Sequence, residues 1–253
     1  MKKLEDFTKD KWFFVTLLAA QGVLLPFASR NFSMQNIGAI VSTTLNNAPQ
    51  VNLGGLNIYF QSLSLLIIVL LIVLRNKMRM IFNVYVAASY LFFAFFQNMA
   101  VTERFGFSIV IVNLVMFLFV AYVWIQEVLL PNNTYNFGNF HWKYIWMIIL
   151  ALFAYWFPFT MGQLDLDPLH FFTRNSATAF CFTTPLFLTI LTFNLPQVNI
   201  VTYRITAIVG FIIGVYNMFS FFNPNTIYLG FAHLPLLIIS LYCAILSYKL
   251  KKN

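Results

Sequence analysis

Charged residues and cysteines are both scarce in this sequence. Only 9% of the residues are charged, and 7 of the 253 are acidic. The hydrophobic fraction of 60%, with a mean hydropathy of +0.79, exceeds the roughly 45 to 50% of ordinary soluble domains. This composition excludes a soluble globular protein. Because almost no polar sequence is left over for a separate module, we expect one integral-membrane domain over residues 1–253.

The cysteine content gives no indication of a disulfide framework or of a cysteine metal site. Cys181 and Cys243 are the two cysteines, and each lies inside an apolar run. The glycine-rich loop that binds phosphate and the serine elbow of hydrolases are also absent from the sequence. No cofactor can therefore be named from its motifs.

The formal charge of +8 does not indicate nucleic-acid binding. A nucleic-acid surface needs a basic patch with interleaved aromatic residues, whereas the lysines and arginines here stand at the ends of apolar runs. Basic residues in that position orient a protein in a bilayer. We therefore exclude nucleic acid and expect membrane lipids as partners.

Eight apolar runs approach the roughly 20 residues that a helix needs to cross about 30 Å of hydrocarbon. Backbone groups in lipid must be satisfied within their own segment, so the runs predict an all-α, polytopic transmembrane helical bundle. The first run also resembles a signal peptide ending at Phe27-Ala28-Ser29. The predicted helices cover residues 12–29, 56–74, 81–101, 107–125, 144–160, 169–193, 205–222 and 227–248.

The distribution of basic residues predicts which ends of the helices face the cytoplasm. With eight crossings and both termini cytoplasmic, 12 of the 15 lysines and arginines fall on the inner side. The exceptions are Arg30, Arg104 and Arg174. This is a strong positive-inside bias. We expect an integral protein of a bacterial or archaeal plasma membrane.

Polar residues within the predicted helices gather near their outer ends. Asn113, Asn217 and His233 lie about 5 to 7 residues, or roughly 7 to 10 Å, below the outer boundary. Polar side chains facing lipid are penalised, so this layer predicts a pocket open to the non-cytoplasmic side. The alternative is that the amides only join neighbouring helices, at about 1 kcal/mol each, and that His233 donates to a carbonyl.

The stretch from Phe157 to Pro185 is the most polar part of the predicted membrane region. Asp167 followed by Pro168 predicts a helix start. In a continuous helix His170 and Arg174 would continue the face of Asp167, and Thr178, Cys181 and Thr184 would extend it inward. Together with kinks expected at Pro158 and Pro185, this arrangement predicts a pocket mouth.

Two other interpretations of the same stretch are open. Asp165 and Asp167 could only cap the helix and pair with Arg174 or Arg104. Asp165, Asp167 and His170 also offer oxygen and nitrogen ligands within one turn, a set that suits zinc or manganese if His233 or Glu103 completes it.

These patterns favour a protein that binds or transports a small solute or ion entering from the outer side. Asn113, Asn217 and His233 would form the site within the bundle, and Asp167, His170 and Arg174 its mouth. One alternative is a membrane-embedded enzyme acting on a lipid-linked or outer-leaflet substrate, with His233 or His170 as general base. The other is a non-catalytic subunit that assembles with further membrane subunits.

Overall fold

The computed structural model of the chain describes residues 2–138 and 141–250. It is 74% helical. Within the described residues, four helical stretches are long and apolar enough to cross a membrane, or five if a helix pair bent by 92° counts as one span. This is the architecture of an all-α integral membrane protein.

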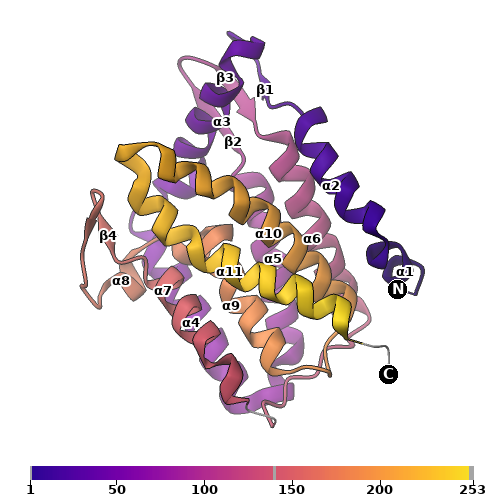
Figure 1. The fold of residues 1–253 in the computed structure, drawn as a ribbon. Helices are drawn as coiled ribbons and strands as arrows, with labels where there is room; N and C mark the ends of the chain where they lie inside the picture. Colours follow the sequence, from indigo (N-terminus) through magenta and orange to yellow (C-terminus); the bar gives the residue numbers. More distant parts are fainter. Residues whose placement is uncertain (1, 139–140, 251–253) are drawn as a thin grey trace.

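The α-helices make up most of the fold (Figure 1). They are α1 (Lys2–Lys9), α2 (Lys11–Val23), α3 (Ile37–Asn46), α4 (Leu56–Leu74), α5 (Arg79–Phe96), α6 (Ile111–Leu129), α7 (Ile145–Trp156), α8 (His170–Thr173), α9 (Phe180–Phe193), α10 (Ile200–Asn217) and α11 (Ile227–Lys249). Short 3-10 helices connect them: η1 (Met34–Asn36), η2 (Pro49–Asn52), η3 (Arg75–Met78), η4 (Trp142–Tyr144), η5 (Ser176–Thr178), η6 (Met218–Phe222) and η7 (Pro224–Thr226).

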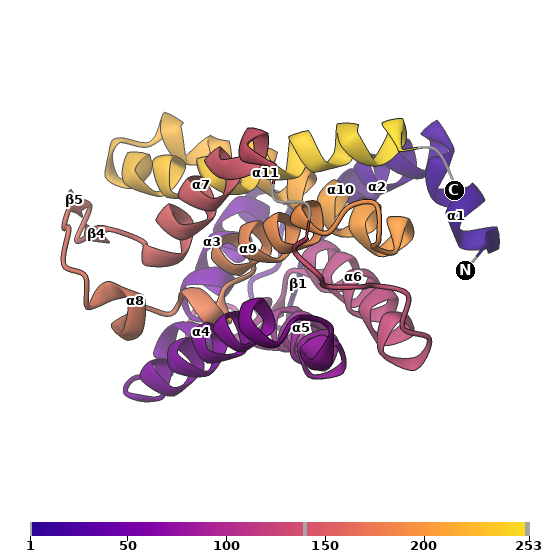
Figure 2. The same ribbon diagram turned by 90° about the horizontal axis from the view of Figure 1, so that it is seen from below.

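Helix α9 lies at the centre of the molecule. In Figure 2 it runs between α4 and α5 on one side and α7 and α11 on the other. Every residue of α9 is buried. Its sequence is mostly apolar, and two of its threonines, Thr189 and Thr192, donate to the carbonyls of Pro185 and Leu188 within the helix at 2.7 and 2.8 Å. A helix that is hydrophobic all round belongs in the interior.

Helices α10 and α11 pack closely because α10 carries small residues on the shared face. A Cβ atom added to Gly214 would lie 2.9 Å from the Cα atom of Leu237, and one added to Gly210 would collide with the hydroxyl of Ser240. The absence of these side chains lets the two backbones approach. The small-residue pattern of this helix is thus a packing seam.

Three predicted helices extend too far at their outer ends. The runs 12–29, 81–101 and 107–125 end or begin instead in the strands β1 (Phe27–Ala28), β2 (Met99–Thr102) and β3 (Gly106–Ile109). They form one antiparallel sheet in the order β1-β3-β2. Gly106, at φ 61°, makes the turn before β3. Apolar composition alone did not reveal that these segments find hydrogen-bond partners in one another.

Two helix ends that are predicted to face the cytoplasm also differ from the prediction. Helix α6 continues to Leu129 and includes Glu127, which is fully buried, and α10 begins at Ile200 rather than at 205. Asn199 caps α10 by accepting from the backbone N–H of Val201 at 3.0 Å. Arg204 therefore lies inside the helix, where it donates to the hydroxyl of Thr8 at 3.1 Å. Both charged residues had been placed at helix boundaries.

The predicted helix 169–193 is broken rather than continuous. Helix α8 and η5 precede α9, and the two parts meet at 92° before Pro185, so the predicted polar face is interrupted. The freed backbone N–H groups of Ala177 and Phe180 donate to the side-chain oxygens of Gln61 at 2.6 Å and Gln97 at 3.0 Å. These side-chain oxygens replace the hydrogen bonds that the break removes, so the backbone can be buried without unsatisfied N–H groups at these two positions.

The preceding helix ends early for a local reason. The prediction ran from 144 to 160, but α7 stops at Trp156, because Phe157 adopts a left-handed conformation at φ 48° and Pro158 follows. Pro158 therefore ends the helix instead of kinking it. The chain then forms the hairpin of β4 (Phe159–Thr160) and β5 (Gln163–Leu164). The predictions 56–74 and 227–248 agree with α4 and α11 to within one residue.

Candidate functional site

A cavity of about 350 Å³ lies between α2, α3, α6 and α10. Most of its wall is apolar, with Leu24 and Pro26 after α2 and Val41 on α3. Three carboxamide side chains also line it, from Gln21, Asn113 and Asn217. Residues nearly 200 positions apart in the sequence thus converge on one partly polar space.

Helix geometry brings the three carboxamides together. Gln21 lies in the last turn of α2, Asn113 in the first turn of α6, where the chain leaves β3, and Asn217 at the end of α10. Gln21 donates to the sulfur of Met116 at 3.1 Å, and Asn217 donates to the carbonyl of Ile213 at 2.9 Å. These contacts fix the direction of both amides.

The three carboxamides that line the cavity have hydrogen-bonding capacity left over. Within the described part of the chain, the amide oxygens of Gln21 and Asn217 accept no hydrogen bond, and the amide of Asn113 makes none. All three side chains are only partly buried. A ligand in the cavity would therefore meet three acceptors and a donor pair without having to break an existing interaction.

His233 does not line this cavity. Its Nδ1 atom lies 2.5 Å from the carbonyl oxygen of Leu229, one helical turn earlier, and its ring packs on Phe182 at 5.1 Å. This contact means that Nδ1 carries the proton and donates to the carbonyl. The structure therefore unites Asn113 and Asn217 and separates His233 from them.

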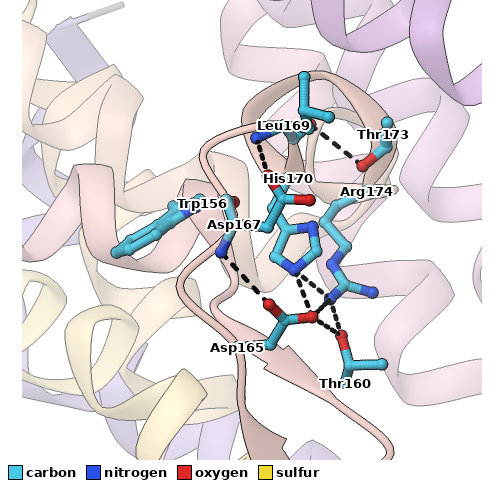
Figure 3. Close-up of polar contacts among 8 residues, drawn as sticks. All are labelled: Trp156, Thr160, Asp165, Asp167, Leu169, His170, Thr173 and Arg174. Carbon is cyan, nitrogen blue, oxygen red and sulfur yellow. Dashed lines mark hydrogen bonds and ion pairs between the residues drawn. The ribbon is translucent and has the colours of Figure 1, made fainter.

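A second polar cluster lies on the hairpin β4–β5 and α8 (Figure 3). The Asp165 carboxylate accepts from the Thr160 hydroxyl at 2.6 Å and lies 3.0 Å from Nε2 of His170. The Arg174 guanidinium donates to Thr160, lies 2.8 Å from the same His170 nitrogen and is 4.0 Å from Asp165. The cluster thus joins the predicted residues His170 and Arg174 to Asp165 and Thr160.

Most polar groups of this cluster pair within it, although the buried Nε atom of Arg174 has no hydrogen-bond partner among the described residues. Hydrogen bonds from Thr160 and then His170 hold the pKa of the Asp165 carboxyl below its ordinary value. The negative charge of Asp165 also faces the positive charge of Arg174. The Asp165–Arg174 pair holds the hairpin against α8. Pairing of Asp165 with Arg174 is one of the alternatives given by the sequence.

Asp167 stands outside the cluster. Its carboxylate accepts from the backbone N–H of Leu169 at 2.9 Å, and its carbonyl accepts from the indole of Trp156 at 2.8 Å. It therefore caps the turn before α8. Among the described residues, no group of three or more histidine, cysteine or acidic side chains is placed so that it could hold a metal ion.

The cluster is not the mouth of the cavity. Figures 1 and 2 both place β4 and α8 at one edge of the molecule and α2 at the opposite one. The three residues predicted as a mouth and the two amides predicted below them therefore belong to separate places in the fold.

Sequence reasoning missed a polar network around Glu127. This carboxylate accepts from the backbone N–H groups of Asn132 at 2.6 Å and Asn133 at 2.5 Å, and from the side chain of Asn199 at 2.8 Å. The network continues through Tyr135, whose pKa is raised by burial and by the nearby Glu127 charge. Asn132 and Asn133, close to Glu127 in the sequence, were the available signal, but α7, α8 and α9 separate them from Asn199 along the chain.

No protein-family model, no curated protein and no solved structure matches this chain.

Proposed function

We propose that this protein is an integral membrane protein that binds, and carries or senses, a small uncharged solute entering from the non-cytoplasmic side. The observation that supports this proposal is the convergence of Gln21, Asn113 and Asn217 on one cavity with otherwise apolar walls. Its volume of about 350 Å³ is at the lower end of the roughly 300 to 1,000 Å³ of small-ligand pockets.

The chemistry of the wall favours an uncharged ligand over an ion. Apart from the phenol of Tyr216, none of the residues that line the cavity has an ionisable side chain. Carboxamides donate and accept hydrogen bonds but do not neutralise a charge, and an ion moved out of water without a counter-charge is strongly disfavoured. A molecule with one hydrogen-bonding end and an apolar body fits both kinds of wall.

We propose eight membrane crossings, with both termini in the cytoplasm of a bacterial or archaeal cell. In Figure 1 the two termini and the inner loops lie toward one end of the molecule, and α3 with the sheet lies at the other, as this topology requires. Three of the proposed crossings have short helices, since α2, α7 and α9 have only 13, 12 and 14 residues. They can serve as crossings if adjoining non-helical segments are covered by protein.

A thermal-stability screen tests the proposed ligand class. The purified protein is heated with sugars, nucleosides and short amides on one side, and with sodium, potassium and chloride salts at matched ionic strength on the other. We expect at least one uncharged compound to raise the melting temperature of the wild type and not that of Asn113→Leu. Stabilisation by an ion alone, equal in both proteins, would contradict the proposal.

The enzyme alternative has less support from its two expected bases. Nε2 of His170 is occupied by Asp165 and Arg174, and His233, whose Nδ1 donates to a backbone carbonyl, keeps Nε2 as a base but does not line the cavity. The alternative of a non-catalytic subunit makes a different prediction in the same screen, because no small molecule would then distinguish the wild type from Asn113→Leu.

A further inference from the structure

A second binding region lies at the inner end of the molecule, away from the cavity just described. An apolar groove of about 320 Å³ is walled by Ile72 on α4 and Leu152 on α7, and Ile190 on α9 contributes to its floor. Its one hydroxyl, on Thr189, is already donated to the carbonyl of Pro185. The groove therefore offers a ligand only apolar contact.

The groove ends at a small polar pocket. This pocket, of about 170 Å³, is lined by Asn136, Asn194 and Gln197 among others, and it shares Phe137 and Phe193 with the groove. Asn194 is committed to backbone groups, since its side chain accepts from the N–H of Asn136 at 2.9 Å. Asn136 and Gln197 are exposed, and the Asn136 amide donates to the Gln197 side-chain oxygen at 3.3 Å. The remaining donors and acceptors of these two amides are available to a ligand.

The groove faces the region where lipid would lie. Ile72 is 52% exposed, and Ile149, next to the wall on α7, is 64% exposed. Along α9 the lining residues extend from Leu186 to Phe193, about 10 Å at 1.5 Å per residue. This distance is a large part of one leaflet of hydrocarbon, which is about 15 Å thick.

Positive charge surrounds the polar end. Arg75 and Lys77 follow α4 directly beyond Ile72, and both are exposed. Lys143 is exposed and places its ammonium 4.8 Å from the ring centre of Tyr144, which in turn packs against Phe193 at 5.9 Å. The sequence of residues 130–143 contains no acid, and Glu127 nearby is fully buried.

We propose that this region binds one anionic phospholipid of the inner leaflet, with an acyl chain in the groove and the phosphate at the polar end. The apolar groove accounts for the chain, the exposed amides accept and donate to the headgroup, and the basic rim selects negative charge. Arg75 and Lys143 would approach the headgroup from η3 and η4, the 3-10 helices that adjoin the wall helices α4 and α7.

Native mass spectrometry of the delipidated protein tests this site. The protein is mixed with equal amounts of phosphatidylglycerol and phosphatidylcholine that carry the same acyl chains, and bound lipids are counted. We expect retention of phosphatidylglycerol by the wild type. Leu152→Trp, which fills the groove, should lose it, and Ile149→Trp, on the same helix but outside the lining, should keep it.

A charge variant distinguishes the contribution of the lipid headgroup to binding from that of the acyl chain. Lys143→Gln should reduce the preference for phosphatidylglycerol about fivefold, the effect of one basic group near an anionic lipid. Lys249→Gln, another exposed basic residue expected on the inner side, should leave the preference unchanged. Equal retention of the two lipids by the wild type, or equal retention of phosphatidylglycerol by Leu152→Trp, would overturn the proposal.

Discussion

The side-chain oxygen of Gln61 accepts a 2.6 Å hydrogen bond from the backbone N–H of Ala177, more than a hundred residues later. Gln61 is fully buried in α4, and Ala177 lies in η5, at the break before α9. A buried glutamine of one helix is thus used to satisfy the backbone of another helix at its break.

Replacing Gln61 should destabilise the fold. Gln61→Leu leaves the Ala177 N–H buried without a partner, at a cost of about 1 to 3 kcal/mol. Ser62→Leu is the matched control, because Ser62 is the next residue and is exposed. The measurement is the free energy of unfolding in mixed micelles, and equal values for the two variants would contradict the capping role.

The seam between α10 and α11 gives a prediction about close packing. Gly214→Ala should destabilise the protein by about 1 to 3 kcal/mol, because the new Cβ atom would lie 2.9 Å from the Leu237 backbone. Gly22→Ala in α2 should be neutral or stabilising, since nothing lies within 4 Å of the added atom. Reversible unfolding of both variants checks the contrast.

The buried carboxylate of Glu127 should matter more than its place near a helix end suggests. Glu127→Ala removes the acceptor for two backbone N–H groups and for Asn199, so we expect a loss of at least about 3 kcal/mol. Glu127→Gln keeps one oxygen and should lose less. Glu103→Gln, at an exposed acid, serves as the control and should change the unfolding free energy little.

The brace at Asp165 should depend on pH. Its pKa is lowered in the folded state, so its stabilising contribution is present above the ordinary value of 3.8 and is lost as the pH falls through the lowered value. The melting temperature of Asp165→Asn should therefore lie below that of the wild type at pH 7, and the two should converge in acid. A difference that persists at the same size below pH 3 would contradict this account.

Hydropathy predicted the fold correctly where a helix makes its backbone hydrogen bonds within itself. The predicted range of α4 equals the observed one, because its residues satisfy their own backbone and face lipid or apolar neighbours. Prediction failed where a distant partner decides the structure. Met99 pairs with Ile109 in a sheet, and Ala177 leaves the helical pattern because Gln61 accepts its N–H.

The candidate site was predictable to a similar extent. Depth along the helices singled out Asn113 and Asn217, which do share a cavity. Depth along a helix does not determine the direction in which a side chain points away from the helix axis. His233 was therefore grouped with the two asparagines because of its similar depth, although it contacts Leu229 and Phe182. For a solute to reach these amides as we propose, the Asn113 cavity must open to the non-cytoplasmic side.

Cysteine accessibility tests that claim most directly. Both native cysteines are buried, so the wild type should give little labelling when intact cells are treated with a membrane-impermeant maleimide. Asn113→Cys should be labelled from outside, and Val115→Cys, two residues away and 46% exposed on the outer surface of the bundle, should not, because lipid would cover it. Asn113→Cys that reacts only after the cells are permeabilised, or no faster than Val115→Cys, would contradict the account.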